Sequence, residues 1–231
     1  MKNYTSLWKL WLKNINMKRF IIVLITSIAF QSFSQVSYDF SEALPLDENP
    51  ISSVSTSDFG TYFSENKETK YIFDAQGIWI ETTIFNSISK DTIRESSKYT
   101  VRNGYIFGVV LNDSLPCVLD ENRYHFGLKV REQVAGGTSK NVLKKLKGSS
   151  YIINYNENDG YTPSLFTLVG KTLTIQYFDY ETGTTIFDVI AQQSSKKVQG
   201  MNYISLAPTK KEWKGIDIAK LFGDKVVYFK N

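Results

Sequence analysis

The sequence contains too few cysteine and histidine side chains for several common kinds of site. It has one of each among 231 residues, Cys117 and His125. One thiol excludes an intrachain disulfide framework and a multi-thiolate metal site, and one imidazole excludes a three-histidine zinc site. A Walker A motif, a dinucleotide-binding glycine pattern and a G-x-S-x-G elbow are also missing from the sequence. These absences predict a noncatalytic protein without a cofactor or a bound metal.

The contexts of Cys117 and His125 are not typical of catalytic residues. Cys117 lies in the apolar stretch Leu-Pro-Cys-Val-Leu, where a thiol behaves as a small hydrophobic group. His125 lies between two aromatic residues of a predicted strand, which favours a structural or surface role. The acidic turns 120–122 and 156–160 lack the spacing of an EF-hand loop, and turn geometry explains their Asn, Asp and Gly residues.

Carboxylates are plentiful, and they leave a hydrolase open as an alternative. Glycoside hydrolysis needs two carboxylates at a set separation, which sequence spacing does not reveal among 23 acidic residues. The candidates on predicted strands or their rims are Glu81, Glu121, Asp159, Asp179, Glu181 and Asp188.

The N-terminal segment has the pattern of an export signal. Lys18 and Arg19 precede an uncharged, mostly apolar run from Phe20 to Phe30, and small residues occupy the positions before a cut after Ser34. The run falls within the roughly 7–15 residues of a signal-peptide core and below the ~18 needed to span a bilayer. Residues 1–34 are therefore predicted to be a signal peptide with an N-terminal extension. Cleavage would leave no transmembrane segment; an uncleaved anchor is the alternative.

The end of this segment, Phe33-Ser34-Gln35, resembles the export signals of Bacteroidota proteins. The resemblance concerns targeting alone, and it implies a periplasmic, outer-membrane-associated or extracellular location. Residues 1–16 carry apolar side chains at helical spacing, typical of an interfacial helix. The simpler interpretations are that Met17 is the true start or that the n-region is long.

After the signal, two regions differ in texture. Residues 35–57 contain Ser, Glu and Pro without apolar periodicity, and they are predicted to form a linker or flexible arm. Residues 58–231 contain short apolar and aromatic runs broken by turn residues, which predicts a single β-rich domain. Hydrophobic content of 42% is sufficient for such a folded domain.

Several strands of this domain are predicted from local pattern. Tyr99–Arg102 and Tyr105–Leu111 flank Asn103-Gly104, a pair that favours a type I′ hairpin turn. The other predicted strands are Lys70–Asp74, Ile78–Phe85, Cys117–Leu119, Arg123–Val130, Tyr151–Asn156, Leu165–Val169, Thr172–Phe178, Thr185–Ala191 and Lys225–Phe229. Ile78–Phe85 and Thr185–Ala191 are apolar on both faces, which indicates a sheet covered on both sides.

Two short helices are also predicted. Ser139 can cap a helix over Lys140–Lys147 that ends at Gly148. Thr209 has capping-box spacing to Glu212, followed by a short apolar segment that ends at Leu221-Phe222-Gly223. The predicted fold class is therefore mainly β: an antiparallel β-sandwich or barrel-like meander with two short helices. Gly108 and Gly127 each follow an aromatic residue in a predicted strand, which predicts a bulge or tight bend at both.

Charge is distributed unevenly along the chain. Five of the 27 cations and no acid lie in residues 1–34, so the remaining 22 cations face 23 acids and do not indicate nucleic-acid binding. Residues 129–147 hold six cations and one acid, whereas residues 35–95 hold four cations and eleven acids. Ordinary solvated faces explain such a distribution; the functional alternative is a surface that binds an envelope protein or anionic lipid. Its candidate partner-binding residues are Lys140, Lys144, Lys145 and Lys147.

Three functional hypotheses follow from these observations. The first is an exported, noncatalytic β-domain that acts as an accessory or interaction subunit of the bacterial cell envelope. The second is a lipocalin-like carrier of a small apolar ligand, suggested by the two-faced aromatic strands. The third is the carboxylate-based hydrolase.

Overall fold

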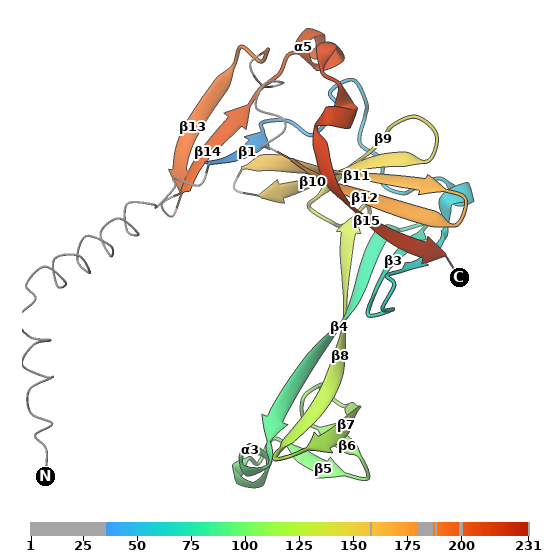
Figure 1. The fold of residues 1–231 in the computed structure, drawn as a ribbon, viewed down its shortest axis with the longest axis vertical. Coiled ribbons are helices and arrows are strands. Elements are labelled where there is room, and N and C mark those ends of the chain that lie inside the picture. The colour runs from blue at the N-terminus through green and yellow to red at the C-terminus, as the bar shows by residue number, and fades with distance from the viewer. Residues whose placement is uncertain (1–35, 158, 180–186, 188, 199–200, 231) are drawn as a thin grey trace, which may run out of the picture.

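Short strands separated by tight turns build one large mixed sheet, which does not close into a barrel. The structure is a computed structural model that describes residues 36–157, 159–179, 187, 189–198 and 201–230 (Figure 1). The strands run in the order β13-β14-β1-β11-β12-β15-β2-β3-β4-β8-β7-β6-β5, with β10 and β9 joined to β11. The predicted mainly β class with two short helices is confirmed, and the sheet is mixed and not closed into a barrel.

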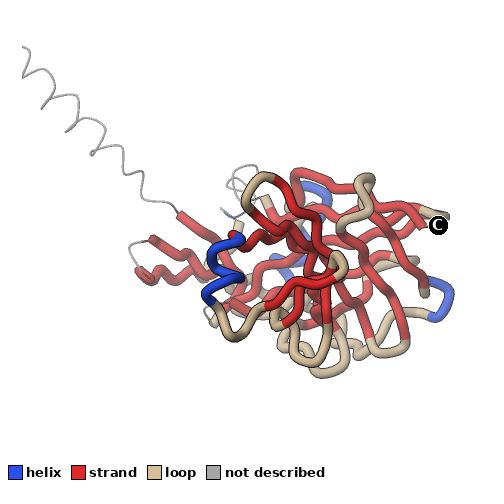
Figure 2. Tube along the Cα trace, turned by 90° about the horizontal axis from the view of Figure 1, so that it is seen from below, coloured by secondary structure: helices blue, strands red, loops and turns tan. Residues whose placement is uncertain are grey.

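The strand bounds show the extent of this sheet. They are β1 (Val36–Phe40), β2 (Gly60–Phe63), β3 (Thr69–Asp74), β4 (Gly77–Ser89), β5 (Thr100–Arg102), β6 (Tyr105–Phe107), β7 (Ser114–Asp120), β8 (Arg123–Ala135), β9 (Val142–Lys145), β10 (Ser150–Glu157), β11 (Gly160–Val169), β12 (Thr172–Phe178), β13 (Gln193–Val198), β14 (Met201–Leu206) and β15 (Phe222–Lys230). The described helical segments are α3 (Lys90–Glu95), α5 (Lys210–Gly215) and the 3-10 turns η1 (Thr56–Asp58) and η2 (Ile218–Lys220). Figure 2 shows these segments as short pieces among strands.

The body of the protein has two apolar cores, one on each face of β10. Tyr151 and Ile153 point into the first core, whereas Ile152 points into the second. The sheet curls around the first core, so that the ring of Tyr71 on β3 lies 5.6 Å from that of Phe166 on β11. The α5 segment covers the second core. Apolar residues on both faces of one strand thus identify a sheet covered on both sides, as expected from the sequence.

A long two-stranded hairpin extends away from the body (Figure 1). Strands β4 and β8 each have 13 residues and pair from Ile78↔Ala135 to Ser89↔Arg123. At about 3.3 Å per residue, this ladder is about 40 Å long. We call residues 83–89 with 123–129 the arm, and residues 90–122, which carry α3 and β5 to β7 at its end, the tip. The sequence predicted both strands but not their full lengths.

Residues 36–57 are packed against the body. The sequence had predicted a flexible N-terminal linker over residues 35–57 instead. Strand β1 pairs with β14 in parallel, and Leu44 is fully buried. The Asn154 side chain accepts a hydrogen bond from the Leu44 N–H and donates one to its carbonyl, at 2.7 and 2.8 Å. Periodicity did not reveal this packing because isolated side chains anchor the segment at irregular intervals. Residues 1–34, the predicted signal peptide, lie outside the described residues.

One predicted helix is confirmed at its start but ends earlier than expected, at Gly215, and the other is wrong. Thr209 and Glu212 form the predicted capping box at the start of α5. In place of a helix over Lys140–Lys147, however, Val142–Lys145 form β9, which pairs with β10. The tertiary pairing overrides local helix propensity, which is a weak prior. The second described α-helix, α3, was not predicted, and most of the predicted strand Thr185–Ala191 lies outside the described residues.

The two Phe-Gly positions differ from each other. The Asn103-Gly104 turn joins β5 to β6 with φ values of 52° and 78°, which confirms the type I′ expectation. Gly108 has a φ of 87°, and a Cβ there would lie 2.0 Å from the Lys98 carbonyl oxygen, so its predicted tight bend is confirmed. Gly127 sits instead in regular pairing with Phe85, and the prediction of a bulge there is wrong.

Candidate functional site

The arm exposes large apolar side chains at its middle. Phe85 is 67% exposed and Ile84 is 46% exposed, and they point to opposite faces of the same strand. Phe85 lies beside Gly127 on β8, where a Cβ would come within 3.7 Å of the phenyl ring. The glycine leaves room for the ring to pack on backbone, a known way in which an aromatic residue supports a glycine in a sheet.

The same part of the arm has a cation at its edge. The Arg123 Nε donates a hydrogen bond to Ser87 Oγ at 2.9 Å, and its guanidinium donates another to the Ser87 carbonyl at 3.1 Å. Arg123 therefore reaches from β8 across β4. His125 is exposed opposite Ser87, and no described carboxylate is paired with its imidazole by a salt bridge.

The four lysines predicted to bind a partner do not form one surface. Lys140 and Lys147 are exposed, whereas the Lys145 ammonium donates a hydrogen bond to Ser55 Oγ at 2.7 Å. Lys144 is 7% exposed, and its ammonium donates to the carbonyls of Ala43 and Pro45, both at 2.8 Å. Burial lowers the pKa of Lys144, and the nearby acids Glu42, Asp47 and Glu48 partly offset this. Partner binding by these lysines stays a prediction, but Lys144 and Lys145 are engaged within the fold.

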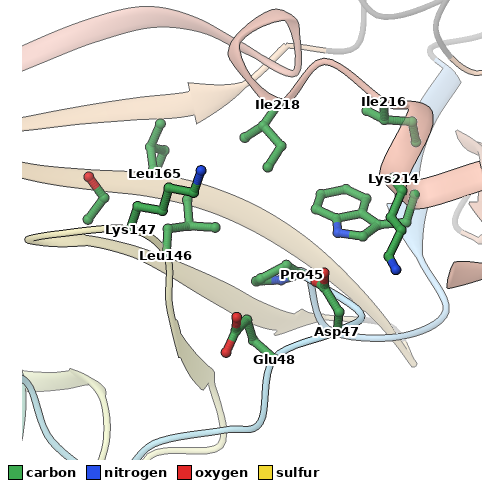
Figure 3. Close-up of a pocket in the computed structure, with 11 residues that line it drawn as sticks. Pro45, Asp47, Glu48, Leu146, Lys147, Leu165, Lys214, Ile216 and Ile218 are labelled. Atoms are coloured by element: carbon green, nitrogen blue, oxygen red, sulfur yellow. The ribbon is translucent and has the colours of Figure 1, made fainter.

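A groove on the body offers a second candidate surface (Figure 3). Its volume is about 550 Å³, and it lies between the 45–48 loop, the β9–β10 turn and α5 with η2. Lys147 and Lys214 lie on opposite sides, with Pro45 between them. The lining is otherwise apolar apart from Asp47, Glu48 and Ser150. Both charge signs occur at its rim, so charge does not select one class of ligand.

A buried polar network joins η1 to β10. The Tyr151 hydroxyl donates a hydrogen bond to Asp58 Oδ2 at 2.5 Å, and the Ser149 hydroxyl donates to Oδ1 at 2.7 Å. The Ser55 N–H donates to the Tyr151 oxygen at 3.0 Å. Burial, followed by the hydrogen bond to Asp58, raises the pKa of Tyr151. Tyr151 has no exposed surface, and its hydroxyl holds η1 against β10 through Asp58.

The other chemically interesting residues are dispersed. Cys117 is half-buried on β7, and burial raises the pKa of its thiol, as its apolar setting predicted. Glu81 forms a 2.7 Å ion pair with Lys70, while Glu121 and Asp159 occupy turn positions with φ of 48° and 67°. Glu181 and Asp188 lie outside the described residues. Within the described ranges, no three His, Cys, Asp or Glu side chains are grouped as metal ligands.

Asp39 on β1 was not among the acids chosen from the sequence. It is 4% exposed, and neither carboxylate oxygen has a hydrogen-bond partner among the described residues. Its side chain lies against Gly160, where a Cβ would come within 2.4 Å of the carboxyl carbon. In the sequence, the feature that marks this buried acid is its position between two aromatic residues in Val-Ser-Tyr-Asp-Phe.

None of the helices in the described part of the chain is long and apolar enough to cross a membrane. A scan against protein-family models finds no match, and searches of curated proteins and of solved structures return no similar chain.

Proposed function

We propose that this protein is an exported, noncatalytic interaction subunit of the bacterial cell envelope, and that the arm is its binding element. The observation that carries the proposal is the projection of the arm from the body with Phe85 and Ile84 exposed on it. Burying apolar surface is favourable by about 25 cal/mol per Å². Phe85 and Ile84 lie just beyond the last β3–β4 pair, on the hairpin that leaves the body, and a partner at this position would bury their exposed apolar surface.

The export signal pattern supports the location. Lys18 and Arg19 with the following apolar run would direct the chain out of the cytoplasm, into the periplasm, to the outer membrane or outside the cell. The carrier alternative has less support because the sheet is not closed around a lumen and aromatic side chains fill the first core. The hydrolase alternative has less support because the candidate acids that the structure describes are dispersed.

The test is to shorten the hairpin without disturbing the body. Thr82 and Val130 are paired neighbours in β4 and β8, so residues 83–129 can be replaced by an Asn-Gly turn. We expect the native protein to be recovered with washed envelopes, with its N-terminus at or near Gln35 by mass spectrometry. The shortened variant should be exported and folded but no longer envelope-associated. An intact N-terminus, or equal association of both proteins, would contradict the proposal.

A lysine variant tests whether the arm or the lysines predicted from the sequence bind the envelope. Lys140→Glu combined with Lys147→Glu changes the two exposed lysines without touching the buried Lys144. If this pair abolishes envelope association and the shortened hairpin does not, the lysine surface is the binding element. His125→Ala and Cys117→Ser should leave association unchanged, since the proposed binding uses neither group.

A further inference from the structure

We propose that the outer edge of β4 in the arm binds an extended segment of a partner protein by strand addition, and that this segment carries an acidic residue near Ser87. This inference rests on the proposed function, since it names the mode and the partner chemistry of the same arm. In strand addition, main-chain hydrogen bonds supply affinity and alternate side chains supply specificity.

The backbone of β4 shows which groups face this edge. The Thr83 N–H donates to the Glu68 carbonyl on the β3 side at 2.9 Å, whereas the Lys90 N–H donates to Asn122 on the β8 side at 2.9 Å. In a strand, alternate residues direct their N–H and C=O groups to the same side. The backbone N–H and C=O groups of Phe85 and Ser87 therefore point away from β8, as those of Thr83 do.

No described strand pairs with β4 on the side of Phe85 and Ser87 that faces away from β8. The pairing of β3 with β4 ends at Thr69↔Thr82, and β4 beyond this point pairs only with β8 among the described strands. The unpaired stretch ends at Ser89, whose hydroxyl accepts the Thr92 N–H and caps α3. The open edge is therefore a bounded window long enough for a short strand.

Three other edges of the described sheet carry protection that the residues of β4 itself lack. The free part of β8 carries Lys129 and Arg131, β13 carries Lys196 and Lys197, and β5 has three residues. Lysines, short strands and covering segments are the usual means of preventing edge-to-edge association. Residues 82–89 contain no charge, and the sequence is rich in β-branched and aromatic residues.

The charge at the window favours an acidic residue in the incoming strand. Arg123 holds its guanidinium at the Ser87 carbonyl, on the edge itself, and an arginine has five N–H donors. Two donors are used by Ser87, so others are available to a carboxylate. Glu68 lies at the opposite end of the window, beside Thr83, which places the favoured acid near Ser87 and away from Glu68.

The same arginine disfavours a second copy as the occupant. Two-fold pairing of β4 with β4 of another molecule would bring both Arg123 guanidinium groups to one shared edge. Like charges placed opposite each other across strands are destabilising. A heterologous segment with a carboxylate meets no such repulsion.

The experiment measures binding of a fluorescein-labelled peptide of about eight residues, with alternating Val and Thr and a central Asp, to the purified full chain. Its control is the same peptide with Lys in place of Asp. The Asp peptide should bind saturably and the Lys peptide roughly tenfold more weakly, since a charge-assisted hydrogen bond is worth about 1.5–3 kcal/mol. Hydrogen exchange should show new protection at the amides of Phe85 and Ser87.

Ser87→Pro is the decisive variant because it removes an outward N–H and no β4–β8 hydrogen bond. Ser87→Ala is its matched control, which removes the hydroxyl and keeps the N–H. We expect Ser87→Pro to abolish binding, Ser87→Ala to retain it, and Arg123→Gln to weaken it roughly tenfold with loss of the Asp preference. Arg123→Gln and the exchange data keep the test valid if Ser87→Pro unfolds the arm.

Three results would overturn the inference. They are no binding of the Asp peptide, equal binding of the Asp and Lys peptides, and a dimer in sedimentation experiments that Ser87→Pro dissociates. If any of these occurs while the shortened hairpin still loses envelope association, the proposed acidic segment is wrong and the proposed function stands.

Discussion

Replacing Asp58 with alanine should destabilise the body through the buried network around Tyr151. Asp58 is 6% exposed and accepts hydrogen bonds from the Tyr151 and Ser149 hydroxyls at 2.5 and 2.7 Å. Hydrogen bonds to charged groups contribute about 1.5–3 kcal/mol each, and a buried donor left unpaired costs about 1–3 kcal/mol. The release of the buried carboxylate from its desolvated position offsets part of this loss. We expect Asp58→Ala to lower the free energy of unfolding by about 2–4 kcal/mol.

The assay is urea unfolding followed by tryptophan fluorescence, with Tyr151→Phe and the double variant completing a cycle. Tyr151→Phe should cost about 1–3 kcal/mol because Asp58 and the Ser55 N–H each lose a partner. The double variant should cost less than the sum by about 1–2 kcal/mol, since the two residues share one interaction. A loss below about 1 kcal/mol for Asp58→Ala, or additivity within about 0.5 kcal/mol, would refute this account of the network.

Three further predictions concern burial and backbone conformation. Burial raises the pKa of Tyr71 above its ordinary 10.0, so the stability that it contributes is complete below pH 10.0 and is lost as pH rises through the folded-state pKa. Urea midpoints should therefore fall above pH 10.0, and less steeply for Tyr71→Phe than for the native protein; an equal fall in both proteins would contradict this. Lys144→Met should lower the free energy of unfolding by about 1–3 kcal/mol, because the carbonyls of Ala43 and Pro45 lose their donor. Its control is Lys147→Met at an exposed position, which should change this free energy by less than about 0.5 kcal/mol. Equal losses of the two variants in thermal unfolding would contradict the buried role of Lys144. Gly108→Ala should destabilise the tip by about 1–3 kcal/mol through its φ of 87°, and Gly127→Ala should cost less, as hydrogen exchange of tip amides can show.

Local features were predictable where neighbouring residues decide them. The Thr172–Phe178 strand has the predicted bounds, because its alternating β-branched and apolar residues begin directly after the Gly170-Lys171 turn. The Asn103-Gly104 turn and the Thr209–Glu212 capping box depend on groups within four residues of one another. In each case the interaction that stabilises the element is contained in the sequence window that predicts it.

Features that depend on distant partners were not predictable in this way. Lys144 occurs in a lysine-rich stretch typical of an exposed helix, yet the carbonyls that bind its ammonium lie about a hundred residues earlier in the chain. The arm edge was missed for the same reason. Its sequence signal, the uncharged run from Thr82 to Ser89, gains meaning only once β3 is seen to stop pairing at Thr82.

The sequence by itself determined the mainly β class, the local turns and caps, and the shortage of cysteine and histidine. These follow from composition and from interactions between near neighbours, which do not need the rest of the fold. The tertiary structure alone decided that residues 36–57 pack on the body, that Lys144 is buried, and that β4 leaves one edge unpaired. Each of these depends on which strands meet across long sequence separations, and the free energy of that pairing overrides local preference.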